Sequence, residues 1–189
     1  GGFKDQGEVI MMAIFIAFIS VAIILILWIV TAQRKLVVLN ENVGNAMCQI
    51  GVQLSSRFDV LMALVHLTKN YAEDESKALI ETVESSRSEI TAKSTPEDVL
   101  RQEGIINEAL GRIALITEQY PELISDETYI KAWEAMQAFE NMLRTSRLIY
   151  NDSVTKLNRE IRMFPVLIIA GMLGFKKRGY LEERAGTGK

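Results

Sequence analysis

Apolar residues form one dense block near the N-terminus and are spaced periodically along the rest of the chain. No charged residue occurs from Val9 to Gln33, and Ser20 is the only hydroxyl inside the apolar run that ends at Thr31. A helix needs about 20 apolar residues to cross the roughly 30 Å core of a bilayer. We therefore predict a membrane-spanning helix over residues 9–33, preceded by a short extracytoplasmic tail, residues 1–8.

A cleaved signal peptide is the alternative interpretation of this block. The sequence Val30-Thr31-Ala32 loosely fits the small-residue cleavage pattern. However, the apolar core of a signal peptide has only about 7–15 residues, and here Lys4 is balanced by Asp5 and Glu8. Both features favour the spanning helix. Because the chain begins with Gly1 rather than Met, we expect its N-terminus to be processed or engineered.

The residues that flank the span predict its orientation. Lys and Arg are retained on the cytoplasmic side, and Trp is enriched at membrane interfaces. The N-terminal flank carries Lys4, the other flank begins with Arg34 and Lys35, and Trp28 precedes the end of the span by one turn. We expect the N-terminus outside and the bulk of the chain in the cytoplasm, with Trp28, Arg34 and Lys35 at the membrane interface.

Beyond the span, apolar residues recur at steps of three and four, the period of an amphipathic helix. Neither proline nor a strong turn signal interrupts the first stripe before about Asn70, so the span should continue into the first soluble helix. A second helix is predicted from Glu73 to about Lys93. The first stripe contains Leu36, Leu39, Val43, Ala46, Ile50, Leu54, Leu61 and Val65.

Two further helices have clear start signals. Thr95 can cap a third helix with Pro96 at its first position, and Pro121 ends it. Ser125 or Asp126 caps a fourth, which stops before Pro165. The apolar stripe of this fourth helix contains Ile130, Trp133, Met136, Leu143, Tyr150, Val154, Leu157 and Ile161.

These elements predict an all-α protein. No segment alternates with period two, so no sheet is expected. Because the connections are short, neighbouring helices should be antiparallel. We predict an N-terminal transmembrane helix continuous with an elongated antiparallel four-helix bundle, residues 34–163, in which the even number of helices returns Met163 to the bilayer surface.

The C-terminal segment is apolar from Val166 to Phe175 and is followed by Lys176, Lys177 and Arg178. Ten residues are too few to cross a bilayer. They suit a segment in the membrane interface, where each basic residue gains about 1 kcal/mol from anionic headgroups. We predict a membrane-interface segment over residues 164–182 and a disordered tail over 183–189. Packing against the base of the bundle is the alternative.

The first and fourth helices are longer than the second and third, so the bundle should thin to two helices near the membrane. Two helices alone would not cover their apolar residues. We therefore expect a self-association or partner-binding stalk there, which makes a homo-oligomer possible. The stalk residues are Leu36, Leu39, Val43, Val154, Leu157 and Ile161.

The charge distribution argues against nucleic-acid binding and supports the predicted position of the bundle relative to the membrane. The chain has 24 acidic and 21 basic residues, and this net charge of −3 lacks the basic excess of a nucleic-acid binder. Residues 73–140 hold 16 acids and 6 bases, whereas residues 144–162 hold 5 bases and 2 acids. The bases thus lie near the anionic leaflet. The acidic faces are either solvated helix surface or a docking surface.

No catalytic or metal-binding constellation is visible. His66 and Cys48 are single, and 18 residues of helix separate them by about 27 Å. We expect His66 on the surface or in the stripe and Cys48 as a small apolar filler. Glu140 and Arg147 are polar residues in the stripe register. They either pair across the core or lie at its edge, and the edge is favoured because buried pairs often give no net stability.

Glycine spacing leaves two interpretations. Gly44 and Gly51, like Gly104 and Gly111, are seven residues apart, which fits either close helix approach or tolerated surface positions. The C-terminal Gly186-Thr-Gly-Lys189 looks like the end of a phosphate loop, but it lacks the first glycine, the preceding strand and the following helix. We interpret it as a terminal sequence.

Several blocks in order resemble the LemA family and extend over about residues 10–182. They are Leu39-Asn-Glu-Asn-Val-Gly-Asn-Ala46, Gln49-Ile-Gly-Val-Gln-Leu54, Arg57-Phe-Asp59, Glu118-Gln-Tyr-Pro-Glu-Leu123, Tyr150-Asn-Asp152, Ile161-Arg-Met-Phe-Pro165 and Leu173-Gly-Phe-Lys176. The resemblance implies a bacterial inner-membrane protein with one N-terminal span and a cytoplasmic antiparallel bundle. It implies no established catalytic activity.

The function that these features favour is a non-catalytic, membrane-anchored scaffold that organises or recruits partner proteins. The alternatives are an accessory subunit of a transporter, channel or enzyme complex, and an organiser of the membrane surface. We expect no cofactor, no metal and no nucleic acid. The expected partners are the lipid bilayer and unidentified membrane or cytoplasmic proteins.

Overall fold

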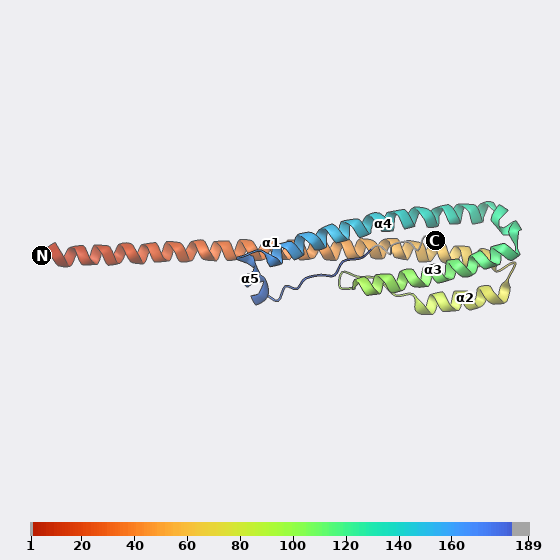
Figure 1. Ribbon diagram of the computed structural model, residues 1–189, viewed down its shortest axis with the longest axis horizontal. Coiled ribbons are helices and arrows are strands. Elements are labelled where there is room, and N and C mark those ends of the chain that lie inside the picture. The colour runs from red at the N-terminus through yellow and green to blue at the C-terminus, as the bar shows by residue number, and fades with distance from the viewer. Residues whose placement is uncertain (1, 183–189) are drawn as a thin grey trace. The chain divides into compact units, whose positions relative to one another are not determined.

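The computed structural model describes residues 2–182, with side chains from residue 6 onward. The helices are α1 (Gly2–Thr68), α2 (Glu73–Ser86), α3 (Pro96–Gln119), the 3-10 helix η1 (Pro121–Ser125), α4 (Glu127–Arg162) and α5 (Val166–Met172) (Figure 1). No strand occurs in residues 2–182, and the predicted all-α class is confirmed. The predicted disordered tail 183–189, with its Gly186–Lys189 sequence, lies outside the described residues.

The described chain divides into two compact units, which share α1 and α4. The span unit consists of residues 2–40 and 157–177, which are the first part of α1, the end of α4, and α5. The bundle unit consists of residues 41–156 and 178–182. It holds the rest of α1, most of α4, and all of α2, α3 and η1.

Helix α1 has the predicted continuity, because it runs without a break from Gly2 to Thr68. Residues 2–8, predicted as a tail, are its first turns. An 18-residue window of this helix has a mean hydropathy of 3.2, and none of that window is buried. Among residues 6–182 it is the one helix long and apolar enough to span a membrane.

In the bundle unit, successive helices alternate in direction (Figure 1). Apart from the half-buried Leu39, the apolar stripe of α1 is buried as predicted, with Ile50, Leu61 and Val65 fully enclosed. Helix α2 packs on α3, which contributes the fully buried Val99, Ile106 and Ile113. The fold is therefore the antiparallel bundle that the periodicity predicts.

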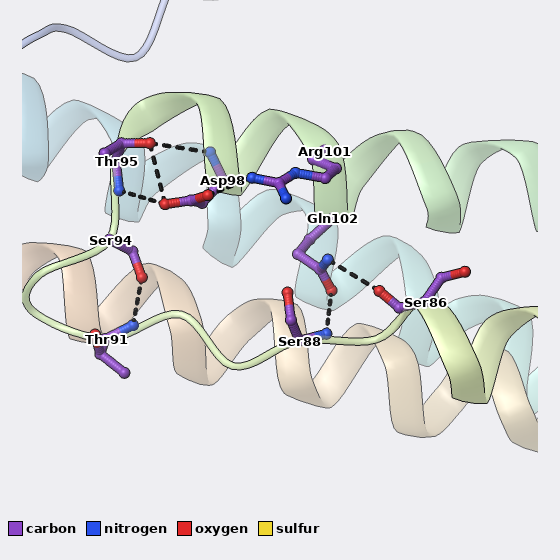
Figure 2. A network of polar contacts seen from close by, with 8 residues as sticks. All are labelled: Ser86, Ser88, Thr91, Ser94, Thr95, Asp98, Arg101 and Gln102. Carbon is purple, nitrogen blue, oxygen red and sulfur yellow. Dashed lines mark hydrogen bonds and ion pairs between the residues drawn. The ribbon is translucent and has the colours of Figure 1, made fainter.

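The start signals of α3 and α4 act as the sequence predicts. The Thr95 hydroxyl accepts a hydrogen bond from the Asp98 backbone N–H at 3.3 Å, and the Asp98 carboxylate accepts one from the Thr95 N–H at 2.9 Å (Figure 2). The Thr95 hydroxyl also donates to this carboxylate at 3.0 Å. The two hydrogen bonds that the carboxylate accepts from Thr95, together with the Arg101 charge, lower the pKa of Asp98. Asp126 caps α4 by accepting from the Thr128 N–H at 2.8 Å.

The prediction that the second helix extends to Lys93 is wrong, because α2 ends at Ser86. The cause is Gln102 of α3, which is 1% exposed. Its side-chain amide donates to the Ser86 carbonyl at 3.2 Å and accepts from the Ser88 N–H at 2.8 Å (Figure 2). A side chain from another helix thus satisfies backbone groups that a continuing helix would have used.

The segment that follows α2, residues 87–93, is held on α1. The Arg87 guanidinium donates to the Asp59 carboxylate at 2.8 Å and to the Ser55 hydroxyl at 2.7 Å, and it lies over the Phe58 ring. Ile90 is 7% exposed. The segment therefore contributes to the core although it is not helical.

The glycines of α1 permit this close approach. A Cβ at Gly51 would lie 2.4 Å from the Ile90 carbonyl oxygen, and one at Gly44 would lie 3.2 Å from the Ala92 Cβ. A Cβ at Gly104 or Gly111 would meet nothing within 4 Å. The first pair of glycines therefore serves close packing, against a non-helical segment, and the second pair occupies open positions.

The apolar stripe of α4 is buried from Met136 to Ile161, as predicted. Its first two members are not, because Ile130 and Trp133 are 43% and 37% exposed. Tyr129, one residue earlier, is instead the buried side chain of this turn, and its ring stacks on Trp133. The prediction is therefore wrong for the first turn of α4.

Residues 178–182 are bound to α4 within the bundle unit. Asn151 donates to the Leu181 carbonyl at 2.8 Å and accepts from the Leu181 N–H at 2.9 Å. The Tyr150 hydroxyl donates to the Gly179 carbonyl at 3.0 Å, and burial raises the pKa of Tyr150. The segment predicted for the membrane interface, 164–182, therefore includes five residues that the structure assigns to the bundle.

Candidate membrane-boundary site

The apolar side chains of the span face outward in a single chain. From Val9 to Val30 the large ones are 37–73% exposed, with Trp28 the least exposed. The 23 residues from Val9 to Thr31 are about 34 Å long at 1.5 Å per residue, which matches a bilayer core. Charge returns at the exposed Arg34 and Lys35, so the boundary between the apolar run and the charged flank lies near Ala32.

The chain returns to this boundary in the span unit. Its buried apolar side chains come from three helices: Ala32 and Leu36 of α1, Leu157 and Ile161 of α4, and Ile169 and Ala170 of α5. Figure 1 shows α5 beside α1 where α4 ends. Because Ala32 belongs to this core, α5 lies at the level where the apolar span gives way to charge.

An ion pair ties the end of α4 to this level. Lys35 Nζ lies 2.8 Å from a carboxylate oxygen of Glu160, whose side chain is only 12% exposed. The position of this pair agrees with the predicted return of the fourth helix to the start of the bundle. It also places the Lys35 ammonium beside α4.

The outward side of α5 and the turn before it form an apolar patch, which we call the α5 patch. Its members are 46–82% exposed, and they are Met163, Phe164, Leu167, Ile168, Met172 and Leu173. Gly174, with φ of 75°, ends α5, and the Phe175 N–H bonds the Ala170 carbonyl. The exposed Lys176 and Lys177 follow the patch, and Phe175 is half-buried.

The basic triplet is divided between the two units. Lys176 and Lys177 end the span unit, whereas Arg178 begins the bundle unit, is half-buried, and lies near enough to Tyr150 to influence it electrostatically. The predicted interface role therefore fits Lys176 and Lys177 better than Arg178.

Most residues of the predicted stalk are covered within a single chain. Leu36, Val43, Val154, Leu157 and Ile161 are at most 6% exposed in a single chain, although Leu39 is only half-buried. The two-helix argument left out further walls. In the span unit α5 supplies one, and in the bundle unit residues 178–182 supply another through the buried Leu181. Apolar coverage therefore does not require self-association at these residues.

A charged network lies inside the bundle unit. Arg57 of α1 is 3% exposed, and its guanidinium is 3.9 Å from the Glu140 carboxylate. Burial lowers the pKa of Arg57, while the nearby carboxylates of Glu140 and Glu103 oppose that shift. Arg147 pairs with Glu103 of α3, and both side chains are nearly enclosed. Glu140 thus lies at the core edge as favoured, whereas Arg147 is paired across the core.

The remaining candidates from the sequence do not come together. His66 and Cys48 are both exposed on α1, so the prediction of Cys48 as a buried filler is wrong. Cys48 lines a surface groove of about 560 Å³ with Gly51, Ser55 and Arg87. Within residues 6–182 no group of three His, Cys, Asp or Glu side chains is placed to hold a metal ion.

The sequence argument missed residues whose partners are remote in the chain. Arg57, Gln102 and Asn151 each bond to a segment brought near only by folding. The signal that could have found Arg57 and Gln102 is their register, because each falls on the apolar face of its helix.

The fold and this site define a class: a membrane-associated, all-α protein with one apolar N-terminal helix and a helical bundle. The particular family follows from comparison of the sequence. The LemA family model matches residues 46–188, about three quarters of the chain, so this chain belongs to the LemA family.

Similar curated proteins come from Paramagnetospirillum and Magnetospirillum. Magnetosome proteins MamQ 1 and MamQ 2 of Paramagnetospirillum magneticum are each 33% identical over 86 residues, which are 46% of this chain and 32% of theirs. Magnetosome protein MamQ of Magnetospirillum gryphiswaldense is 27% identical over 158 residues, 70% of this chain and 58% of that protein. The chain spans between one third and three fifths of the length of these relatives.

Proposed function

We propose that this protein is a non-catalytic scaffold of the bacterial inner membrane, with its N-terminus outside and its bundle in the cytoplasm. The observation that carries the proposal is the α5 patch. It places six exposed apolar side chains at the level of Ala32, where the apolar span ends. The span and the α5 patch anchor the chain, and the bundle is left to recruit partner proteins.

Physical chemistry supports lipid as the neighbour of the α5 patch. A soluble protein rarely leaves so many large apolar side chains exposed together without a partner for them. Lys176 and Lys177 follow directly, and each gains about 1 kcal/mol beside anionic headgroups. An interfacial helix next to a spanning helix would also fix the rotation of the anchor, because two attachments resist turning better than one.

A recruiting role for the bundle is supported by its surface. Its buried charges are structural pairs, and its outer faces between Glu73 and Glu140 are mainly acidic. The LemA family membership is compatible with this role, as is the likeness to the MamQ proteins. Because the chain matches only part of those relatives, their magnetosome role is not carried over to it.

Photo-crosslinking in cells tests both halves of the proposal. We expect a benzophenone side chain at Met172, which is 82% exposed in the α5 patch, to form lipid adducts. The same group at Met142 on the bundle, 50% exposed, should form protein adducts. Replacing Lys176 and Lys177 with Gln should reduce the lipid adducts, whereas Lys93→Gln on the bundle should not. Protein adducts alone at Met172, or lipid adducts alone at Met142, would contradict the respective half.

Orientation is tested by the single thiol. Cys48 is exposed, so it should react readily with a maleimide wherever the reagent has access. We expect a membrane-impermeant maleimide to leave Cys48 unlabelled in intact cells and to label it after the inner membrane is permeabilised. Labelling before permeabilisation would place the bundle outside. Cys48→Ser, which has no thiol, is the control for background.

A further inference from the structure

An apolar groove lies where α3, η1 and α4 meet in the bundle unit. It has a volume of about 410 Å³, within the range of ligand-binding pockets. Its lining includes Thr117 of α3, Ile124 of η1, and Tyr129, Ile130, Trp133 and Glu134 of α4. It is therefore built mainly from apolar side chains of three different elements.

The exposure of these side chains is unusual for this bundle. Ile124, Ile130 and Trp133 are 52%, 43% and 37% exposed, although Ile130 and Trp133 continue the stripe that α4 buries farther on. Tyr129 and Trp133 stack with an angle of 8° between their rings and 6.4 Å between centroids. The groove thus has a stacked aromatic wall and apolar side chains that residues 6–182 leave partly exposed.

The segment that supplies most of the lining is strongly acidic. Residues 118–134 contain five of the seven lining residues, among them Glu134. In this segment Glu118, Glu122, Asp126, Glu127 and Glu134 are all exposed. The one base in it, Lys131, lies 2.7 Å from the Glu127 carboxylate. Five carboxylates and one ammonium give the segment a charge of −4. Its complement is an apolar surface bordered by positive charge.

We propose that this groove binds a basic amphipathic helix of a partner protein. Amphipathic helices bind grooves by placing apolar anchors spaced three or four residues apart, and the opposite charges at the rim set orientation and association rate. Ile130 and Trp133 provide the apolar contact surface for the helix. Glu122 and Glu134 provide negative charge that attracts its basic residues. The inference rests on the proposed scaffold function and names its kind of partner.

The test uses the full-length protein in uncharged detergent with Trp28→Phe, so that Trp133 is the only tryptophan. The probe is an 18-residue amphipathic helical peptide of Leu and Lys, and its matched control contains Glu in place of Lys. We expect saturable binding of the Lys peptide with a blue shift of Trp133 emission and a Kd that rises with salt. The Glu peptide should not bind.

Variants with matched controls locate the binding. Ile130→Ser should raise the Kd at least tenfold, whereas Leu148→Ser, at a 64% exposed position elsewhere on α4, should not change it. Replacing Glu122 and Glu134 with Gln should raise the Kd about three- to tenfold and reduce its salt dependence. The same change at Glu81 and Glu84, exposed on α2, should have little effect.

Three results would overturn the proposal: equal binding of both peptides, equal effects of Ile130→Ser and Leu148→Ser, or no saturable binding. A dimer detected by sedimentation and abolished by Ile130→Ser would also overturn it, by identifying a second copy as the occupant. The outcome is separable from the scaffold proposal. If Met142 formed protein adducts but the groove bound no peptide, the scaffold proposal would stand and the partner would bind at another surface.

Discussion

Gly51→Ala should lower the free energy of unfolding of the bundle by about 2–3 kcal/mol and should detach residues 87–93 from α1. The new Cβ would lie 2.4 Å from the Ile90 carbonyl oxygen and 3.2 Å from the carbonyl carbon. These are backbone atoms, so no side-chain rotation relieves the clash. The segment must move away, and exposing a buried Ile costs about 1.5–3 kcal/mol.

Denaturant unfolding followed by circular dichroism measures this loss, and amide hydrogen exchange of residues 87–93 measures the detachment. Gly104→Ala and Gly111→Ala are matched controls, because a Cβ at either position meets nothing within 4 Å. Removing a mid-helix glycine should stabilise α3 by up to about 1 kcal/mol. If Gly51→Ala were as stable as these controls, the close approach of residues 87–93 to α1 would be wrong.

Glu103→Leu should cost about 3–5 kcal/mol, because it leaves a buried charge without its partner. Glu103 pairs with Arg147, and the two side chains are 13% and 14% exposed. Glu103 also offsets part of the burial that lowers the pKa of Arg57. Its removal therefore leaves two guanidinium groups close together in the core, while Glu140, the other carboxylate that acts on Arg57, is largely exposed.

The double replacement of Glu103 and Arg147 by Leu should be much less costly than Glu103→Leu alone. The double replacement removes both the attraction of Glu103 and the repulsion of Arg147 that act on Arg57. It also removes Arg147 Nε, a buried atom that has no hydrogen-bond partner among the described residues. Glu108→Leu on the same helix is the surface control, since its pair with Arg112 is largely exposed and should contribute little. Equal losses for the single and double variants, measured in denaturant, would contradict the coupling.

The sequence predicted those features that depend on neighbours along the chain. The span followed from the uninterrupted apolar run, and the start of α3 followed from Thr95, Pro96 and Asp98. The continuity of α1 followed from the absence of any breaker before about Asn70. Capping bonds and apolar periodicity act within one or two helical turns, so they can be recognised without the fold.

Other features needed partners that the sequence does not identify. The end of α2 at Ser86 depends on Gln102, sixteen residues later. Gly51 and Gly111 look alike in the sequence, but only Gly51 is approached by another backbone. The two-helix argument for the stalk did not include α5 and residues 178–182, which also contribute buried apolar side chains. Self-association at the stalk stays a prediction.

The candidate site is divided in the same way. The sequence predicted its components as separate stretches: the span, the basic flank and the apolar segment after Pro165. The sequence did not show that α5 shares a buried core with Ala32, or that Lys35 pairs with Glu160. The apolar groove at the start of α4 was missed, because the stripe predicted Ile130 and Trp133 as buried.

The sequence by itself determined the helical class, the long apolar N-terminal helix and the number of bundle helices, since these follow from hydrophobic period, run length and local capping. Only the tertiary structure decided where α2 ends, which glycines are packed, which charges are paired and which apolar side chains remain exposed. The physical reason is that burial and ion pairing depend on contacts between segments that are distant in the sequence. Periodicity shows which face of a helix is apolar, but it does not show which segment covers that face.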